Sequence, residues 1–358
     1  ALTYTAVAAV SLSLAMPVGN LVDKWRPRRT GAASMMLLGV LSTSTIFVTE
    51  LRGFVVLQLV TAVVNVFMRV NQQAFMGRLR EGAARVKMMA YQRAVTNVGI
   101  GLGSLAAGIA LAINTATAFK VLFILDGVTW VVAAIIRLRL PDLDPIPAQG
   151  KRRRTEALRD RAYLGIVGIN TVLAMNYQVL NLAVPLYVDQ FTKAPKWVVA
   201  ATMLVNTAMV ALFQVQASRG TDTPRRAAGV MHRSAYYFAA GYAVYAAAKW
   251  ANTALLAATV VLAGAFLHTL GELRQAASAW GLQYSLARKE YQGQYQSVWS
   301  MGWQINGLIT PPLVTALCLG LKEPGWWLLG VLAIAAGSLA PRVTRAALAT
   351  RPELEHAA

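Results

Sequence analysis

Side chains that could bind a polar solute or exchange a proton lie inside long apolar stretches of this sequence. Glu272 is the acid of the stretch 253–285, and His268 and Gln275 fall on the same helical face, one turn before it and one turn after it. A carboxylate in such surroundings is a candidate for taking up and releasing a proton. A second polar set shares one helical face at spacings i, i+4, i+7 and i+8: Asn65, Arg69, Gln72 and Gln73.

Glu272 needs a partner, because a charge at the centre of a membrane helix costs about 2.5–3.5 kcal/mol on insertion scales. Arg69 is the expected partner, and Arg274 lies close by in sequence. Three alternatives stay open: a fixed ion pair, a carboxylate that exchanges a proton or contacts a solute, and a position for Glu272 near the cytoplasmic end of its helix. His268 is expected to be neutral and hydrogen-bonded, although an imidazole could titrate near neutral pH.

Motifs for catalysis and for metal or cofactor binding are absent from the sequence. Cys318 is the single cysteine, which excludes a disulfide framework and leaves no Cys/His cluster for zinc. The patterns GxSxG, GxxxxGK[ST] and HExxH do not occur. We therefore expect no enzymatic activity, no metal and no cofactor.

The composition is typical of a membrane protein. Of the 358 residues, 56% are hydrophobic and 14% are charged, whereas a soluble domain averages about 25% charged residues. Apolar stretches of about 20 residues recur, which as helices are long enough to cross about 30 Å of hydrocarbon. The predicted fold class is an all-α integral membrane protein with eleven spans: 1–22, 29–49, 53–77, 90–113, 117–137, 162–188, 196–217, 228–248, 253–285, 295–319 and 325–341.

Basic residues are distributed unequally between alternate loops. The formal net charge is +19, from 34 Lys and Arg against 15 Asp and Glu. One set of loops, with the C-terminal tail, carries 25 of the 34, the other set carries 6, and Arg69, Arg93 and Arg274 fall within or at the edge of spans. The positive-inside rule places the first set, including the central linker and the C-terminus, in the cytoplasm. The charge therefore indicates membrane topology, and we expect no nucleic-acid partner.

The sequence contains an internal repeat. Pro27-Arg28-Arg29 recurs 197 residues later as Pro224-Arg225-Arg226, and Tyr91-Gln92 recurs 204 residues later as Tyr295-Gln296. Such a repeat indicates two parallel halves. Five spans precede the long polar linker and six follow it, so we expect that a first helix is missing from a six-plus-six arrangement. The predicted domains are an N-terminal bundle, 1–138 (helices 2 to 6), a cytoplasmic linker, 139–161, and a C-terminal bundle with a short cytoplasmic tail, 162–358 (helices 7 to 12).

Residues 19–29 resemble the loop signature between helices 2 and 3 of the major facilitator superfamily. Gly19, Leu21 and Asp23, followed by the basic turn, match its order of residues, while Arg26 stands where the signature has Gly and Pro27 where it has a basic residue. The resemblance implies two six-helix bundles, with eleven of twelve transmembrane helices present, and transport by alternating access. It also implies a gating motif in which Asp23 approaches the N-terminus of helix 11; its residues are Gly19, Asp23, Arg28 and Arg29.

In this superfamily helices 1, 4, 7 and 10 line a central cavity. Helices 4, 7 and 10 correspond to the third, sixth and ninth spans of this chain, and all three carry polar side chains. The resemblance therefore implies a set of cavity and coupling residues: Asn65, Arg69, Gln72, Gln73, Asn170, Tyr177, Asn181, His268, Glu272 and Gln275.

Helices 5 and 6 carry two further candidates. Gly99, Gly103 and Gly108, with Ser104 and Ala107 between them, partly resemble a Gly-rich pattern of proton-coupled antiporters in the superfamily. The alternative is that these small residues let two helices approach closely. Asp126 is expected to make a structural hydrogen bond to a neighbouring helix, with a role in transport as the alternative.

These features predict a secondary active transporter, similar to drug/proton antiporters, that exports small organic molecules in exchange for protons. The alternatives are a solute/proton symporter for uptake and a non-transporting membrane sensor or scaffold. Arg outnumbers Lys by 25 to 9, which favours a bacterial source. The expected partners are the lipid bilayer, a small-molecule substrate and protons, and the protein is expected to be a monomer in the plasma membrane.

Overall fold

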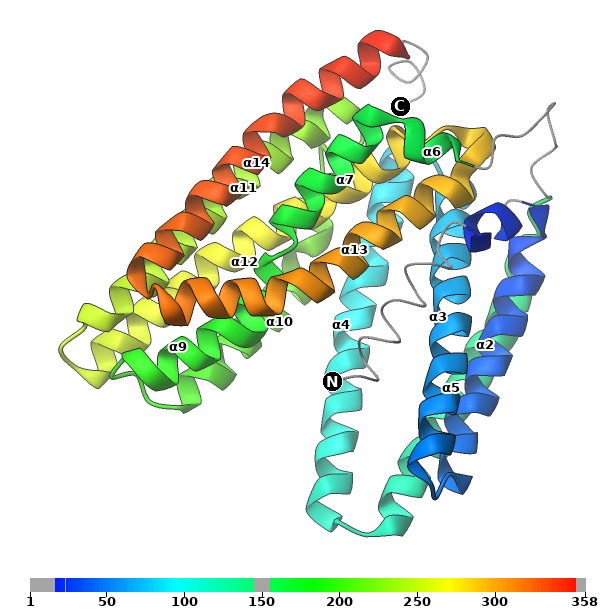
Figure 1. Cartoon of the computed structure of the whole chain (residues 1–358), viewed down its shortest axis with the longest axis horizontal. Helices are drawn as coiled ribbons and strands as arrows, with labels where there is room; N and C mark the ends of the chain where they lie inside the picture. The colour runs from blue at the N-terminus through cyan, green and yellow to red at the C-terminus, as the bar shows by residue number, and fades with distance from the viewer. Residues whose placement is uncertain (1–16, 23, 145–154, 352–358) are drawn as a thin grey trace. The chain divides into compact units, whose positions relative to one another are not determined.

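The computed structural model describes residues 17–22, 24–144 and 155–351. Within these ranges every regular element is a helix, so the predicted all-α class is confirmed. The chain divides into two compact units, and each is described by itself (Figure 1). Unit 1 comprises Ala1–Arg80, Gly99–Asp160 and Ala287–Gln304, and unit 2 comprises Glu81–Val98, Arg161–Leu286 and Ile305–Ala358. The division into two six-helix bundles around residues 139–161 stays a prediction.

Unit 1 is built on α2 (Pro27–Ser44), which continues into η1 (Thr45–Phe47), on α3 (Leu51–Leu79) and on α5 (Ala116–Leu138). Pro27 opens α2 at a position where no backbone donor is needed, and the Thr115 hydroxyl caps α5 by accepting from the Ala118 N–H at 3.2 Å. α2 packs along both α5 and α3. The first of these contacts requires glycine, because a Cβ on Gly39 would lie 2.9 Å from the carbonyl oxygen of Gly127.

Unit 1 also contains shorter or partial elements. These are the second half of α4 (Gly82–Ile113), α6 (Glu156–Arg159), η4 (Lys289–Tyr291) and the first half of α13 (Gln292–Thr315).

Unit 2 is centred on α11 (Pro224–Ala247), which packs against both α12 (Ala254–Ser285) and α14 (Glu323–Thr350). α10 (Trp197–Ala217) packs on α12, while η3 (Ala248–Trp250) and η5 (Ala316–Gly320) extend α11 and α13. Small residues again allow close contact: a Cβ on Gly264 would lie 2.7 Å from the Tyr245 ring. The first half of α4 belongs to this unit.

The predicted span 162–188 is interrupted in the structure. α7 (Arg161–Leu173) ends in a turn at residues 174–175, which is followed by α8 (Asn176–Gln178), the π-helix η2 (Val179–Ala183) and α9 (Val184–Phe191). Pro185 in the first turn of α9 has no N–H to continue an α-helical ladder, which accounts for the wider turn before it. A π-helical turn within a helix is often found at a functional site.

The predicted spans agree with the helices in the described ranges. Eight segments are long and apolar enough to cross a membrane: Pro27–Phe47, Leu51–Leu79, Gly82–Ile113, Ala116–Leu138, Arg161–Phe191, Trp197–Ala217, Ala254–Ser285 and Glu323–Thr350. α11 and α13 form at two more predicted spans but are not among these eight, since they carry more polar residues. The first predicted span, 1–22, lies mostly outside the described residues; its last part, 17–22, is helical.

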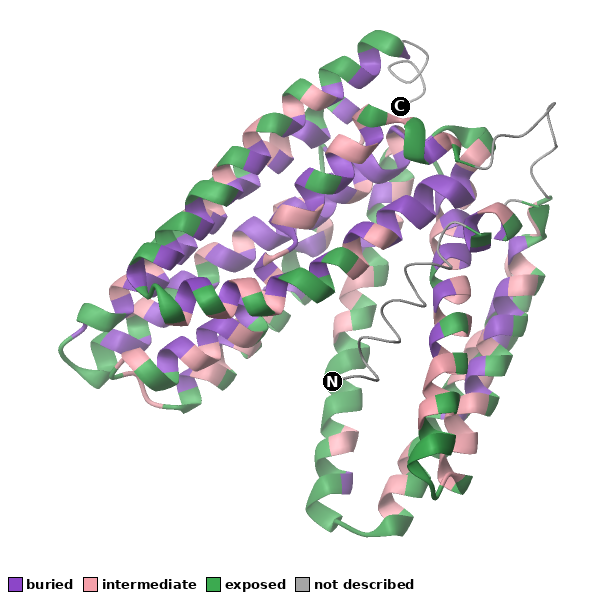
Figure 2. Ribbon diagram, in the orientation of Figure 1, coloured by how far each residue is buried: buried purple, intermediate pink, exposed green. Residues whose placement is uncertain are grey.

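Large apolar side chains are exposed along several of these helices. Figure 2 shows exposed positions along α4. Among them are the large apolar residues Val95, Ile100, Leu102, Leu105 and Ile109. A continuous apolar surface of this kind is costly in water and favourable in hydrocarbon. The exposure pattern is therefore the one expected of membrane-spanning helices.

Candidate functional site

Glu272 is buried and lies at the centre of a polar cluster in unit 2. Its Oε1 accepts from Nη2 of Arg93 on α4 in an ion pair. Its Oε2 accepts from Nδ2 of Asn206 on α10 at 2.6 Å. The side chains of Glu272 and Arg93 are only 4% and 13% exposed. Both carboxylate oxygens are thus engaged, one by a cation and one by a neutral amide.

Two more side chains complete this group. Asn206 also donates to the hydroxyl of Thr269 on α12 at 3.2 Å, which fixes the orientation of the amide. The guanidinium carbon of Arg93 lies 5.5 Å from the centre of the Tyr177 ring, within the range of a cation–π contact. We call these five residues the Glu272 cluster: Arg93, Tyr177, Asn206, Thr269 and Glu272. They come from α4, α8, α10 and α12, and all lie in unit 2.

The expected pairing of Glu272 with Arg69 is wrong, because the basic partner in the structure is Arg93. Arg274, the other basic residue considered, packs against the Tyr237 ring at 4.6 Å. From the sequence, Arg93 was expected near the edge of a span beginning at residue 90. α4 in fact begins at Gly82, so Arg93 lies about three turns inside the helix at 3.6 residues per turn. Asn206 was also missed, since an amide in an apolar stretch gives no sign of its partner.

The other predicted residues of unit 2 form separate contacts. Gln275 donates to the side-chain oxygen of Asn170 at 2.6 Å, and both residues are buried. Asn181 donates to the backbone oxygen of Tyr177 at 2.8 Å. The fully buried His268 ring packs among three aromatic rings, those of Phe238, Tyr242 and Tyr245, with centroid distances of 5.6, 5.7 and 6.0 Å. Of the predicted set, only Tyr177 therefore joins Glu272 in its cluster.

The predicted residues of α3 lie in unit 1. Asn65 donates to the backbone oxygen of Thr61 at 3.0 Å, one turn earlier on the same helix. Arg69 is exposed on the surface of its unit, and Gln73 is half-buried. Gln72 accepts a hydrogen bond from Arg137 on α5. This last contact leads to a residue that the sequence analysis assigned to a loop.

Arg137 was counted among the cytoplasmic loop charges, but the structure buries it at 3% exposure. α5 continues through Leu138, so Arg137 lies in its last turn and reaches into unit 1. Its guanidinium donates to Asn71 Oδ1 at 2.9 Å and to the Pro27 carbonyl at 3.2 Å. The Phe75 ring lies 4.0 Å from the guanidinium carbon. Arg137 thereby joins α2, α3 and α5 through neutral partners.

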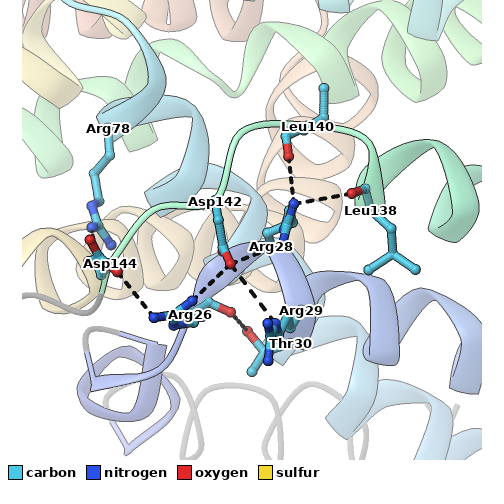
Figure 3. Close-up of polar contacts among 9 residues, drawn as sticks. All are labelled: Arg26, Arg28, Arg29, Thr30, Arg78, Leu138, Leu140, Asp142 and Asp144. Carbon is cyan, nitrogen blue, oxygen red and sulfur yellow. Dashed lines mark hydrogen bonds and ion pairs between the residues drawn. The ribbon is translucent and has the colours of Figure 1, made fainter.

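The gating motif is described in part, and its Arg residues contact the segment after α5 (Figure 3). Arg28 donates to Asp142 at 3.0 Å and to the carbonyls of Leu138 and Leu140 at 3.3 Å each. Arg26, the departure from the family signature, pairs with the same Asp142 oxygen at 3.1 Å. Arg29 is 3.9 Å from that oxygen and is 67% exposed. Asp23 lies outside the described residues.

Gly19 belongs to the same motif and packs against the first turns of α13. A Cβ on Gly19 would lie 2.5 Å from the carbonyl oxygen of Gly293 and would overlap the Ser297 hydroxyl. The neighbouring Asn20 accepts from Gln294 at 3.0 Å. α13 corresponds to helix 11 in the family numbering. The contact therefore lies at the N-terminal end of helix 11, which the loop signature is expected to approach.

The pattern of the Major Facilitator Superfamily matches residues 1–311. The chain belongs to the major facilitator superfamily. Solved structures of this superfamily share its fold. A bacterial homologue of the iron transporter ferroportin in an outward-facing state gives a TM-score of 0.71 at 13% identity, covering 97% of this chain and 90% of that one.

Two further relatives of the fold are similar at the same level. The human organic anion transporter MFSD10 (TETRAN) gives a TM-score of 0.73 at 13% identity, with 95% of this chain and 83% of that chain covered. The proton:xylose symporter XylE bound to 6-bromo-6-deoxy-D-glucose gives 0.71 at 9% identity, with coverage of 94% and 84%. No curated protein matches the sequence. At these identities the structural likeness shows the fold, and this member of the superfamily is a multi-pass membrane transporter for a small molecule.

The remaining candidates of this superfamily member lie on α4 and α5. A Cβ added to Gly99, Gly103 or Gly108 meets no atom within 4 Å among the described residues, so the close helix contact offered as an alternative is not found there. Asp126 accepts from the Ser42 hydroxyl on α2 at 2.6 Å. That hydrogen bond joins α2 to α5, as expected of a structural role.

Proposed function

We propose that this transporter is proton-coupled and moves a small organic solute by alternating access, with Glu272 as the coupling carboxylate. The single observation that carries this proposal is the buried ion pair of Glu272 with Arg93, completed by Asn206. The charges of a buried pair compensate each other only while both are present, and removing one leaves the other uncompensated. Protonation of Glu272 removes the negative charge of the pair and leaves Arg93 without a charged partner.

Proton occupancy is therefore coupled to conformation at this cluster. The ionised carboxylate holds α4, α10 and α12 together through Arg93 and Asn206. The neutral acid loses the ionic part of its contact with α4. A ligand shifts a conformational equilibrium only as far as it binds the two states differently, and a proton on Glu272 meets this condition.

Two directions of coupling are supported by different observations. The sequence pattern at Gly99, Gly103 and Gly108 supports export of the solute in exchange for protons. The pairing of Glu272 with a permanently charged Arg93 favours co-transport, since the proton releases a cation that can meet a solute. The two possibilities predict solute flux in opposite directions under the same pH gradient, so measuring flux with the gradient in each orientation distinguishes them.

The test uses the full-length protein in proteoliposomes with a pH-sensitive dye inside. A panel of small organic solutes is screened for flux driven by a pH gradient, first in one orientation and then in the other. Glu272→Gln is expected to abolish proton-driven flux, and Asp126→Asn, the matched control at the acid bonded to Ser42, is expected to retain it. Normal proton-driven flux in Glu272→Gln would place the coupling elsewhere. Failure of every solute to move would favour the sensor or scaffold alternative.

The loop signature supports a gate at the cytoplasmic side. Gly19 allows its segment to lie against the first turns of α13, where no side chain has room. Gly19→Ala is expected to weaken this contact and to increase labelling of a cysteine at Asn65 from the cytoplasm. Gly168→Ala is the control, because a Cβ there meets nothing within 4 Å in the described structure. Equal labelling of the two variants would remove the gating role.

The asymmetry of 25 against 6 basic residues, or 24 against 6 without the buried Arg137, supports a cytoplasmic linker and C-terminus in the plasma membrane. The buried Cys318 is first replaced by Ser. Single cysteines at Lys193 and Arg152 are then treated with an impermeant reagent on intact cells. The residue at position 193 is expected to react and the residue at position 152 is not; the opposite pattern would reverse the topology.

A further inference from the structure

We propose that Arg93 is the group that binds the solute, and that the solute is an organic anion such as a carboxylate or a sulfonate. In this proposal, protonation of Glu272 releases the Arg93 guanidinium, and the anion takes the place of the carboxylate. The inference rests on the proposed proton coupling at Glu272, and it selects co-transport between the two directions considered above.

Glu272 is the one acid among the helices around it. α4, α8, α10 and α11, together with α12 and the two other elements packed on it, α7 and η3, contain one acid between them, Glu272. Arg93 from α4 is paired with Glu272, and the phenols of Tyr177 on α8 and of Tyr242 and Tyr245 on α11 lie within electrostatic reach of it. α10 contributes the neutral Asn206. Tyr163 of α7 donates instead to the Gln283 carbonyl, and Lys249 of η3 pairs with Glu323. His268 lies one turn away on α12 itself. No second carboxylate is present on these helices to replace Glu272 as the partner of Arg93.

Protonation of Glu272 leaves the charge of Arg93 in place. An arginine side chain stays charged at any physiological pH. When Glu272 becomes neutral, the Arg93 guanidinium, which is 13% exposed, loses its charged partner. Desolvated cations of this kind are stable when they are paired. An anion restores the pairing, whereas a neutral solute leaves Arg93 unpaired and a cation opposes it.

The geometry of the Arg93 guanidinium also suits an anion. A guanidinium offers a planar fork of N–H donors that matches the oxygens of a carboxylate or a sulfonate. The Tyr177 ring lies 5.5 Å from the guanidinium carbon and supports the side chain from the interrupted helix segment. Asn206 remains beside Glu272 and can accept from or donate to the neutral acid. The cluster therefore keeps one oriented donor group for an anion after the proton has bound.

Linkage then determines the direction of coupling. If the proton favours the anion, the anion favours the proton by the same factor. Binding of an anion at Arg93 must therefore take up a proton at Glu272. The two ligands occupy the transporter together, so they cross the membrane in the same direction.

The experiment measures binding to the purified full-length protein by titration calorimetry, with probes whose own charge does not change with pH. Methanesulfonate, benzenesulfonate and naphthalenesulfonate span a range of sizes, and the corresponding sulfonamides are the neutral controls. Proton uptake is followed in weakly buffered solution. The wild type is expected to bind at least one sulfonate more tightly as the pH falls, approaching a tenfold change per pH unit, with one proton taken up per anion.

Three variants make the result specific. Glu272→Gln is expected to bind the same sulfonate with an affinity that does not change with pH and to take up no proton. The double variant Arg93→Gln with Glu272→Gln removes both buried charges, so it keeps the site neutral, and it is expected to lose sulfonate binding. Arg93→Lys is expected to retain pH-dependent binding with reduced affinity, since it keeps the charge but not the fork.

Each contrary outcome overturns the inference. Absence of binding of all three sulfonates to folded Glu272→Gln protein would do so, as would equal binding of sulfonates and sulfonamides. Sulfonate binding by the double variant equal to that of Glu272→Gln would show that Arg93 is not the binding group. The proposed function fails separately: if Glu272→Gln retains proton-driven flux in proteoliposomes, the coupling carboxylate is wrong whatever the sulfonates do.

Discussion

Two arginines with little exposed surface, Arg137 in unit 1 and Arg93 in unit 2, have partners of opposite kinds. The two Nη groups of Arg137 in unit 1 donate to neutral groups, namely the side-chain oxygens of Asn71 and Gln72 and the carbonyl of Pro27, and the guanidinium lies over the Phe75 ring. Arg93 in unit 2 is paired with the carboxylate of Glu272. Amide and carbonyl oxygens do not titrate, so the surroundings of Arg137 are the same at any pH. The surroundings of Arg93 change as soon as one proton binds.

The comparison separates a structural arginine from one that can take part in coupling. Burial alone does not identify a functional charge, since Arg137 is as buried as Glu272, at 3% exposure each. What differs is whether the partner can change its charge. Arg137 is therefore expected to affect stability alone, and Arg93 is expected to affect stability, proton coupling and binding together.

The largest effect is expected from removing one member of the charged pair. Arg93→Gln should lower the free energy of unfolding by about 3–5 kcal/mol, because Glu272 is left buried without a cation. Glu272→Gln should destabilise by a comparable mechanism, and the double variant should recover much of the loss. A double-mutant cycle on thermal unfolding in detergent measures the coupling. Strict additivity of the two single changes would mean that the pair contributes nothing.

An intermediate loss of stability is expected from replacing Arg137, whose partners are all neutral. Arg137→Met removes the donor from Asn71 and Pro27, and leaving buried acceptors unsatisfied costs about 1–3 kcal/mol. The loss should be the same at every pH at which the protein is folded, because no described partner of Arg137 is an acid. Unfolding measured at several pH values checks this. A strong pH dependence of the loss would place Arg137 in the same class as Arg93.

The smallest effect is expected where an arginine has an acidic partner but is partly exposed to solvent. Arg28 is 25% exposed and donates to Asp142 at 3.0 Å, to the carbonyl of Leu138 at the end of α5 and to the carbonyl of Leu140 after it. Arg28→Ala should cost about 1 kcal/mol, the typical net value of such hydrogen bonds. Arg29→Ala is the matched control, since Arg29 is 67% exposed and 3.9 Å from Asp142. Indistinguishable melting temperatures for the two variants would show that the contacts of Arg28 in Figure 3 do not contribute.

The helices were predictable from the sequence because lipid leaves one solution for a long apolar run. Glu272 and Tyr177 could be singled out from the sequence, because a polar side chain within such a run is costly; the structure brings both into one polar cluster. The partners were not predictable. Arg93 was placed at a helix end because α4 begins at Gly82, eight residues before the predicted start of its span at residue 90. A shift of a helix boundary moves a basic residue from the interface to the interior without any change in composition.

The prediction for Arg137 was wrong for the opposite reason. The sequence counted it with the loop charges, which are solvated, but it lies in the last turn of α5 and reaches inward. Nothing in the local sequence distinguishes the two outcomes. The decision depends on Asn71 and Gln72, which are more than 60 residues away in sequence and adjacent only in the folded unit.

The central claim, that a proton on Glu272 opens its ion pair with Arg93, is tested most directly by infrared difference spectroscopy of the full-length protein in lipid. Acidification through the range in which proton-driven flux occurs should produce a protonated-carboxyl band and remove an equal carboxylate band. Both changes should be absent in Glu272→Gln and present in Asp126→Asn. If the wild-type and Glu272→Gln spectra change identically over that range, Glu272 does not take up the proton, and its pairing with Arg93 is a fixed structural contact.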